Sequence, residues 1–175
     1  DVAFASKRDP LEFRLEMCAS DARATAVLRK AAELAGWGKK LPKGRGRGIA
    51  LALGYDSYCA EVVEVSVKNR KVKIERIVAV FDCGMMIDPH NVEAQVEGGV
   101  IWGLSAAIDG QIHFANGAAV EDNFHTAPIL RINQTPRIEV HLLKTDHKSG
   151  GAGEASVPGV APALASAIHM ASGER

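Results

Sequence analysis

The sequence lacks the features that would place it in several common classes of protein. No run of about 18 apolar residues is present, which argues against a membrane-spanning helix. Lys and Arg together number 21, as do Asp and Glu, so the formal net charge is zero. A chain without net charge has no long-range field to attract nucleic acid or an anionic membrane.

Patterned metal, redox and nucleophile motifs are also missing. The three cysteines, Cys18, Cys59 and Cys83, form no CxxC pair, which favours buried, reduced thiols. The six histidines have no HxH, HExxH or HxxxH spacing, so we expect no metal held by protein side chains. The sequence contains no GxSxG elbow, no Walker loop and no dinucleotide fingerprint.

The first ten residues, DVAFASKRDP, contain neither an initiator Met nor a signal peptide. They are typical of the interior of a protein, and we expect the chain to be a fragment. Its 47% hydrophobic and 24% charged residues are those of a globular protein. With 175 residues it can form one domain or two small ones.

Helical spacing of apolar residues predicts a helical segment over residues 9–36, capped by Asp9-Pro10, restarted at Ser20-Asp21 and ended by Gly36. Strand patterns begin at Gly48. They predict an antiparallel hairpin with a turn at residues 68–70 and bulges where the alternation slips.

The second half of the chain returns to helices. Residues 90–108 and about 157–171 are predicted helices, with short strands between residues 109 and 144. Gly98, Gly99 and Gly103 would weaken the first of these helices, so we expect a close neighbour beside them. Helices and hairpins in separate blocks, without a βαβ rhythm, indicate an α+β fold.

The basic, glycine-rich segment 39–47 has two interpretations. It is either a solvated connector or a contact for nucleic acid. The zero net charge and the lack of interleaved aromatic residues favour the connector.

Glu154 lies between a glycine-rich loop and the last predicted helix. On local physics alone, capping that helix is the simpler role, with the helix dipole favouring the ionised carboxylate. An ionised carboxylate in a glycine-walled pocket also suits a general base. Gln95 likewise has two interpretations: a structural partner inside the protein, which we favour, or a hydrogen-bonding group for a ligand.

Several separate motifs occur together in one order, and they resemble a known family. They are GRGRGIAL, VVEVSV, FDCGMMIDPHNVEAQVEGGVIWGLSAAI, NFHTAPILR and GGAGEASVPGVAPALASAI. This combination resembles the C-terminal region of the molybdopterin-binding subunit of the xanthine dehydrogenase/aldehyde oxidase family. The branch it most resembles contains isoquinoline 1-oxidoreductase beta subunits and related aldehyde dehydrogenases.

The resemblance implies an α+β molybdenum-cofactor-binding domain. It implies residues 1–38 as a helical segment and residues 39–175 as the C-terminal part of the molybdopterin-binding domain. The implied cofactor is molybdopterin with molybdenum, commonly in the cytosine dinucleotide form. The implied reaction hydroxylates an aldehyde or an N-heterocycle with oxygen from water.

The implied partners are the N-terminal remainder of the subunit and a [2Fe-2S] iron–sulfur subunit. We expect the chain alone to be inactive. The alternative is a non-catalytic assembly or binding domain that keeps the fold.

Carried over residue by residue, the resemblance makes Glu154 the catalytic general base. Gly151, Ala152 and Gly153 match the loop beside the cofactor, and Gln95 matches a glutamine that hydrogen-bonds the cofactor region. Three departures from the family pattern are Asp88-Pro89 for Asn-Pro, Pro158-Gly159 for Pro-Pro, and Ser166-Ala167-Ile168 for Asn-Ala-Ile.

Overall fold

A four-stranded sheet with the strand order β1-β2-β3-β6 forms the centre of the computed structural model, which describes residues 2–174. Strands β1 (Arg45–Gly54), β2 (Ser57–Lys68) and β3 (Lys71–Asp82) are antiparallel, and β6 (Arg137–Leu142) pairs in parallel with β3. The helices are α1 (Val2–Ala5), α2 (Pro10–Met17), α3 (Ala22–Ala35), α4 (Pro89–Asp109), α5 (Val160–Ser172) and the 3-10 turn η1 (Ile132–Gln134). Strands β4 (Phe114–Ala115) and β5 (Ala118–Ala119) form a short separate hairpin.

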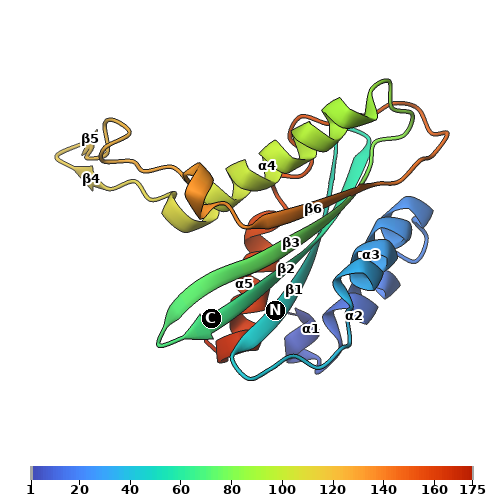
Figure 1. Cartoon of the computed structure of the whole chain (residues 1–175), viewed down its shortest axis with the longest axis horizontal. Coiled ribbons are helices and arrows are strands. Elements are labelled where there is room, and N and C mark those ends of the chain that lie inside the picture. The colour runs from blue at the N-terminus through green and yellow to red at the C-terminus, as the bar shows by residue number, and fades with distance from the viewer. Residues whose placement is uncertain (1, 175) are drawn as a thin grey trace.

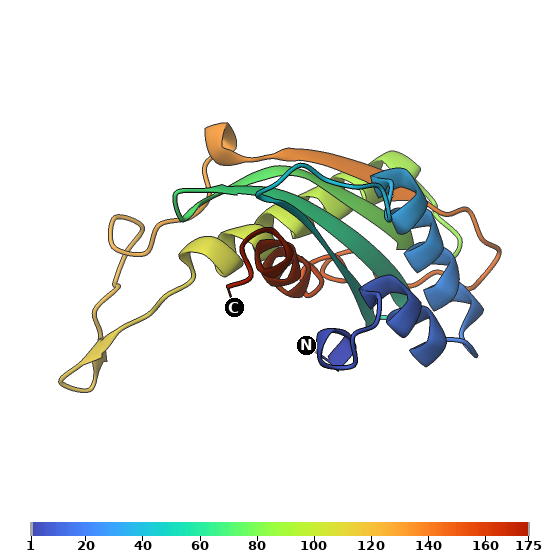
Figure 2. The same cartoon turned by 90° about the horizontal axis from the view of Figure 1, so that it is seen from below.

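Helices cover both faces of the sheet (Figures 1 and 2). On one face, α2 and α3 pack against an apolar cluster that includes Ala60 and Val62 of β2. On the other face, α4 and α5 pack against Cys59, Val63 and Val65. Because β2 is buried on both faces, its apolar residues follow one another without strict alternation.

A half-buried ion-pair cluster joins α3 to the sheet. Arg47 Nε lies 2.7 Å and Arg76 Nη2 3.0 Å from Glu64 Oε1. The same two guanidinium groups donate to the last carbonyl groups of the helix, Arg47 to Gly36 O and Arg76 to Ala35 O. Cations at a helix C-terminus are stabilising because they complement the helix dipole.

Most of the predicted elements are confirmed. Asp9 and Asp21 cap α2 and α3, and Gly36 ends α3 in the left-handed conformation. The register of β2 and β3 shifts between Glu64 and Val65, where a bulge was expected. The α+β class is confirmed.

Three predictions on the elements need correction. The sequence pattern did not separate β1 from β2, which turn at Tyr55 and Asp56. One βαβ crossover is present, because α4 connects β3 to the parallel strand β6. The last helix begins at Val160 rather than 157. Asp1 and Arg175, the outer limits of the two predicted domains, lie outside the described residues.

The expected close neighbour of α4 is the segment that leads into α5. Ser156 is fully buried, and its Oγ donates to Val96 O of α4 over 3.1 Å. A Cβ atom at Gly99 would overlap Ser156 Oγ, and one at Gly103 would lie 2.6 Å from Val157 O. Among the described residues nothing lies within 4 Å of a Cβ atom at Gly98, so the expected neighbour of that residue stays a prediction.

Asp82 and Arg23 form the contact that gathers the loops at one end of the sheet. Arg23 Nε lies 2.7 Å from Asp82 Oδ2, and Nη2 lies 2.9 Å from Oδ1. Asp82 Oδ1 also accepts from Gly84 N and Thr145 Oγ1, both over 2.8 Å. Burial alone would raise the pKa of Asp82, but these hydrogen bonds hold it below its usual value.

Arg23 also reaches the turn between β1 and β2. Its Nη1 donates to Asp56 O over 3.1 Å, and its guanidinium lies 4.5 Å from the centre of the Tyr58 ring. One buried pair therefore connects α3, the end of β3, the segment after β6 and the β1–β2 turn.

The glycine contacts of α4 generate a prediction. Gly103→Ala lowers the free energy of unfolding by about 1–3 kcal/mol, because the new Cβ pushes against the backbone of Val157. Gly98→Ala is the matched control and raises it by up to about 1 kcal/mol, because alanine is the better helix former. Denaturant unfolding of the two variants checks the prediction, and equal effects at both positions would contradict it.

The Asp82–Arg23 pair generates a second prediction. Asp82→Asn lowers the free energy of unfolding by about 3–5 kcal/mol, because it leaves the half-buried Arg23 charge without its partner. Asp146→Asn, at an exposed position near the same segment, changes it by less than about 0.5 kcal/mol. Thermal unfolding at neutral pH distinguishes the two variants; a loss below 1 kcal/mol in Asp82→Asn would show that the pair is dispensable.

Candidate functional site

The loop that carries Glu154 is fixed to the β1–β2 turn and to the end of β3. Gly150 N donates to Cys83 O, and Gly151 N donates to Tyr55 O, each over 2.7 Å. Ser57 Oγ donates to Gly151 O, also over 2.7 Å. A Cβ atom at Gly151 would lie 2.8 Å from Tyr55 Cβ, so the loop approaches the turn this closely only because glycine stands there.

The Glu154 side chain is exposed and hydrogen-bonded to a tyrosine. Tyr55 Oη donates to Glu154 Oε2 over 3.0 Å. This hydrogen bond, with the negative charge of Glu154, raises the pKa of the Tyr55 hydroxyl. Glu154 Oε1 accepts no hydrogen bond from residues 2–174 and is open to a ligand.

The capping interpretation of Glu154 is wrong. The N-cap residue of α5 is Gly159, which makes no side-chain cap, and the helix starts six residues after Glu154. Favourable helix-dipole interactions fall off within the first turn, so the α5 dipole does not account for the position of this carboxylate. Its fixed partner is Tyr55 instead.

Tyr55 is a site residue that the sequence did not reveal. It has a φ of 58° and Asp56 one of 60°, a left-handed turn that costs side-chain-bearing residues energy. The contacts of Arg23 with Asp56 and of Gly151 with Tyr55 hold this turn in place. The Gly-Tyr-Asp-Ser stretch between two apolar runs was the available signal, but it gives no hint of a partner 99 positions away.

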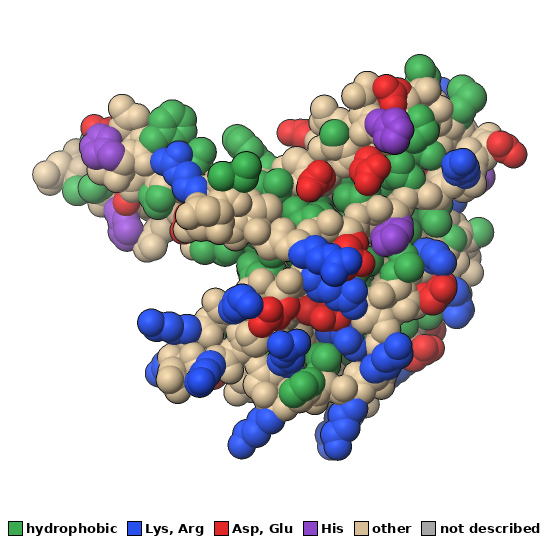
Figure 3. Space-filling view, viewed as in Figure 1, with side chains coloured by type: hydrophobic (Ala, Val, Ile, Leu, Met, Phe, Trp, Pro, Cys, Tyr) green, Lys and Arg blue, Asp and Glu red, His purple; other side chains and the backbone are tan. Residues whose placement is uncertain are grey.

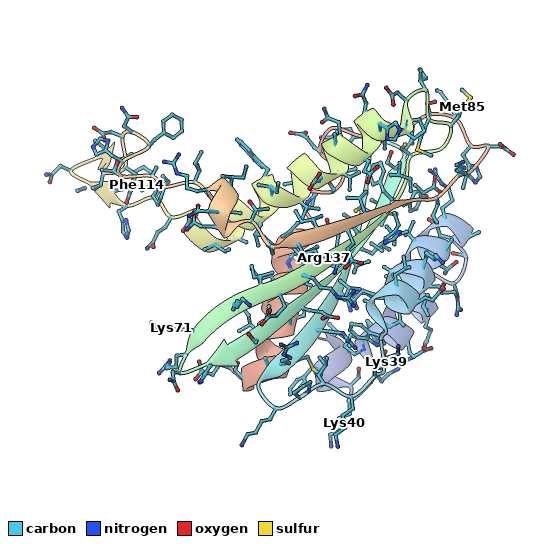
Figure 4. The ribbon with its side chains drawn as sticks, in the orientation of Figure 1. Lys39, Lys40, Lys71, Met85, Phe114 and Arg137 are labelled. Carbon is cyan, nitrogen blue, oxygen red and sulfur yellow. The ribbon has the colours of Figure 1, made fainter. Side chains whose placement is uncertain are left out.

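A cavity of about 400 Å³ lies beside the Glu154 loop. One wall is the segment from Cys83 to Gln95, at the start of α4, and the other is formed by Ser149, Gly150 and Ala152. Met85, which Figure 4 labels at this end of the molecule, belongs to the first wall. The site is therefore at the end of the sheet where the Asp82–Arg23 pair gathers the loops.

Gln95 lines this cavity and is exposed, so the structural partner that we favoured for it is not found among the described residues. Within residues 2–174 its amide makes no hydrogen bond. A free amide offers donors and an acceptor at one point.

The residues around the cavity fit a pterin-type cofactor. The backbone N–H groups of Ala152, Gly153 and Glu154 have no acceptor among the described residues, so they are available as donors. Gln95 supplies further polar atoms from the opposite wall, and Met85 and Met86 supply apolar surface. Among residues 2–174 there is no group of three His, Cys, Asp or Glu that would hold a metal ion. The donor set suits an organic ligand that carries its own metal.

The basic segment 39–47 lies at the opposite end of the sheet. Lys39 and Lys40 are exposed there (Figure 4), and the chain enters β1 at Arg45. Figure 3 shows Lys and Arg side chains gathered over this end of the molecule, away from the cavity. This arrangement fits the connector interpretation. No helix among the described residues has the length and hydropathy needed to cross a bilayer.

Residues 16–136 match the model of the molybdopterin cofactor-binding domain family. The isoquinoline 1-oxidoreductase subunit beta of Brevundimonas diminuta is 36% identical, with an alignment over 99% of this chain and 23% of that protein. A membrane-bound aldehyde dehydrogenase (pyrroloquinoline-quinone) of Gluconacetobacter polyoxogenes is 32% identical, over 100% of this chain and 25% of that protein. The chain thus spans about a quarter of the length of these relatives.

Two solved structures share the fold. A Cu,Mo-CO dehydrogenase superposes with a TM-score of 0.60 at 24% identity, over 66% of this chain and 16% of that chain. The quinoline 2-oxidoreductase of Pseudomonas putida 86 superposes with a TM-score of 0.61 at 22% identity, again over 66% and 16%. With the family model covering most of its length, the chain belongs to the molybdopterin cofactor-binding domains of the xanthine dehydrogenase/aldehyde oxidase family.

Proposed function

We propose that the chain is the C-terminal part of the molybdopterin-binding subunit of a molybdenum hydroxylase and that Glu154 is its general base. The observation that carries this proposal is the exposed Glu154 carboxylate on a glycine loop that forms one wall of the cavity. A carboxylate held by one hydrogen bond and otherwise open is placed to accept a proton.

Tyr55 and Glu154 have different roles at this site. The Tyr55 hydroxyl holds Oε2 and fixes the plane of the carboxylate, which leaves Oε1 to take the proton. A bound molybdenum cofactor would supply the centre that receives two electrons from the substrate and through which oxygen from water is delivered. Removing a proton from the attacking group strengthens it as a nucleophile, and this is the part of the reaction that the chain itself performs.

The cofactor would be held from two sides. Ala152 lines the cavity, and the free N–H groups of Ala152 and Gly153 would donate to the cofactor from the loop, while Gln95 would offer its amide from α4. Gly151 would contribute by holding this loop against Tyr55. We propose molybdopterin, in the cytosine dinucleotide form, as the cofactor. A substrate of the aldehyde or N-heteroaromatic class is supported by the names of the relatives, an isoquinoline oxidoreductase and an aldehyde dehydrogenase.

The remainder of the subunit is the proposed partner for the outer surface of α4 and the arm that follows it. Residues 110–131 extend away from the sheet (Figure 1). Large apolar side chains are exposed along α4 and this arm, among them Trp102 at 72%, Phe114 at 77% and Phe124 at 68%. Apolar surface of this extent marks an interface. We propose that electrons leave through a [2Fe-2S] subunit, the partner that the family resemblance implies.

Replacing the base tests the proposal. Glu154→Gln in the full-length enzyme lowers kcat by about 10²- to 10⁴-fold, because the amide accepts no proton, while molybdenum and pterin content stay unchanged. The control is Glu33→Gln, on α3 across the sheet, which leaves kcat as it is. Steady-state kinetics and metal analysis measure kcat and molybdenum content, and wild-type turnover in Glu154→Gln would refute the role of Glu154 as the base.

Tyr55→Phe removes the hydroxyl that holds Glu154 and keeps the ring. We expect kcat to fall about tenfold, the lower end for a hydrogen bond to a charged group, because this one is exposed. KM and cofactor content stay within about twofold, since the backbone contact from Gly151 N to Tyr55 O remains. A drop in cofactor content that matches the drop in kcat would mean that Tyr55 serves the fold and not the base.

A further inference from the structure

Glu61 is a carboxyl group inside the protein that the proposed reaction does not use. It lies in the middle of β2 on the face covered by α4 and α5, and its exposed fraction is 0%. Cys59 Sγ donates weakly to Oε1 over 3.7 Å. Oε2 is buried with no hydrogen-bond partner in the described chain. Buried polar atoms without partners are rare and call for an explanation.

The unpartnered oxygen is pressed against the start of α5. Glu61 Oε2 occupies the space that a Cβ atom at Gly159 would fill, and Gly159 is the N-cap residue of this helix. Gly159 is itself buried and follows Glu154 by five residues. Between them, Ser156 is anchored to α4 through Val96 O. The Glu61 carboxyl therefore packs directly against the junction between the Glu154 loop and α5.

Among residues 2–174, no cationic side chain interacts with the Glu61 carboxyl, and the start of α5 beside it carries only the partial positive charge of a helix N-terminus. Its neighbours on the adjacent strands are Ala50 and Ala79. The buried face of α5 consists of Val160, Ala163, Leu164 and Ala167, and that of α4 consists of Val96, Gly99, Val100, Gly103 and Leu104. Cys59 is the titratable group in contact with it, and burial raises the pKa of that thiol as well.

We propose that Glu61 is a positioning residue, whose uncharged carboxyl packs under Gly159 and keeps the Glu154 loop in its working place. When Glu61 loses its proton, a negative charge without a partner stands in the apolar layer beneath α5. The junction then has to move to admit water or to separate from the sheet. This inference rests on the proposed role of Glu154, and it makes the placement of the base dependent on the protonation of a second carboxyl that never contacts substrate.

The pH window follows from burial. Desolvation raises the pKa of Glu61 to about 8, against the opposing effect of the Cys59 hydrogen bond. The folded state then keeps a proton that the unfolded state has lost, from about pH 4.5 to about pH 8. Stability from this group is complete below the unfolded pKa, falls as the pH rises through that interval and is lost above pH 8.

The first test uses Glu61→Gln in the full-length holoenzyme, because glutamine has the same shape and does not ionise. We expect kcat at pH 6.5 to stay within about twofold, since the neutral forms fill the same space. We expect the wild-type kcat profile to have an alkaline limb near pH 8, and this limb to move up by at least about one pH unit in the variant. A profile identical to that of the wild type overturns the proposal, and so does a variant that loses stability while its alkaline limb stays near pH 8.

The second test exploits the contact itself. Gly159→Ala alone lowers the unfolding midpoint and kcat, because the added Cβ overlaps Glu61 Oε2. The double variant Glu61→Ala/Gly159→Ala lacks the carboxyl and so has room for the added Cβ atom. We therefore expect its unfolding midpoint and its kcat to be higher than those of Gly159→Ala. Effects that merely add would show that the two residues are not coupled and would overturn the proposal. A third measurement needs no variant: hydrogen exchange of residues 155–163 in the wild type, corrected for the intrinsic rate, rises above pH 8.

Failure of this inference is distinguishable from failure of the proposed function. If Glu154→Gln abolishes turnover while Glu61→Gln leaves the pH profile unchanged, Glu154 is the base and Glu61 does not position it. If Glu154→Gln turns over normally, the proposed function itself is wrong. The pH dependence of stability and the Gly159 coupling then still report whether Glu61 supports the junction.

Discussion

The ion pair between buried Asp82 and half-buried Arg23 holds together the loops that form the site. Asp82 is the last residue of β3, and its carboxylate accepts hydrogen bonds from Arg23 of α3, from Gly84 and from Thr145. Arg23 extends the contact to Asp56, and so holds the left-handed turn whose Tyr55 donates to Glu154. The Glu154 carboxylate is exposed, but the Asp82 carboxylate that anchors this series of contacts is buried. The Asp82–Arg23 ion pair therefore orients the exposed Glu154 carboxylate through the β1–β2 turn.

Two carboxyl groups in this chain show how burial divides roles. Glu154 is at the surface, with one carboxylate oxygen held by Tyr55 and the other open to a ligand. Glu61 is in the core, where the charged form is disfavoured and burial raises its pKa to about 8. The four residues between Glu154 and Gly159 connect the two environments, so a change of charge in the core has a short path to the site.

Local signals in the sequence predicted the helices well and the site only in part. Asp9, Asp21 and Gly36 carry capping chemistry within a few residues of their effect, so the ends of α2 and α3 were predictable. Glu154 and Gln95 came from the family resemblance, since their surroundings consist of backbone and residues far away in the chain. Tyr55 and Glu61 were not predicted. Their roles arise from contacts across 99 and 98 positions, which no local pattern encodes.

We propose that the loop of Glu154, fixed by Tyr55 and by the Asp82–Arg23 pair, forms one wall of the molybdenum cofactor site, with Gln95 on the other. The most direct measurement is an experimental structure of the full-length enzyme loaded with its cofactor. We expect the Glu154 carboxylate to face the molybdenum with the Tyr55 hydrogen bond intact, and the Gln95 amide to contact the cofactor. A cofactor bound at another face of the sheet, with Glu154 directed into solvent, would contradict it.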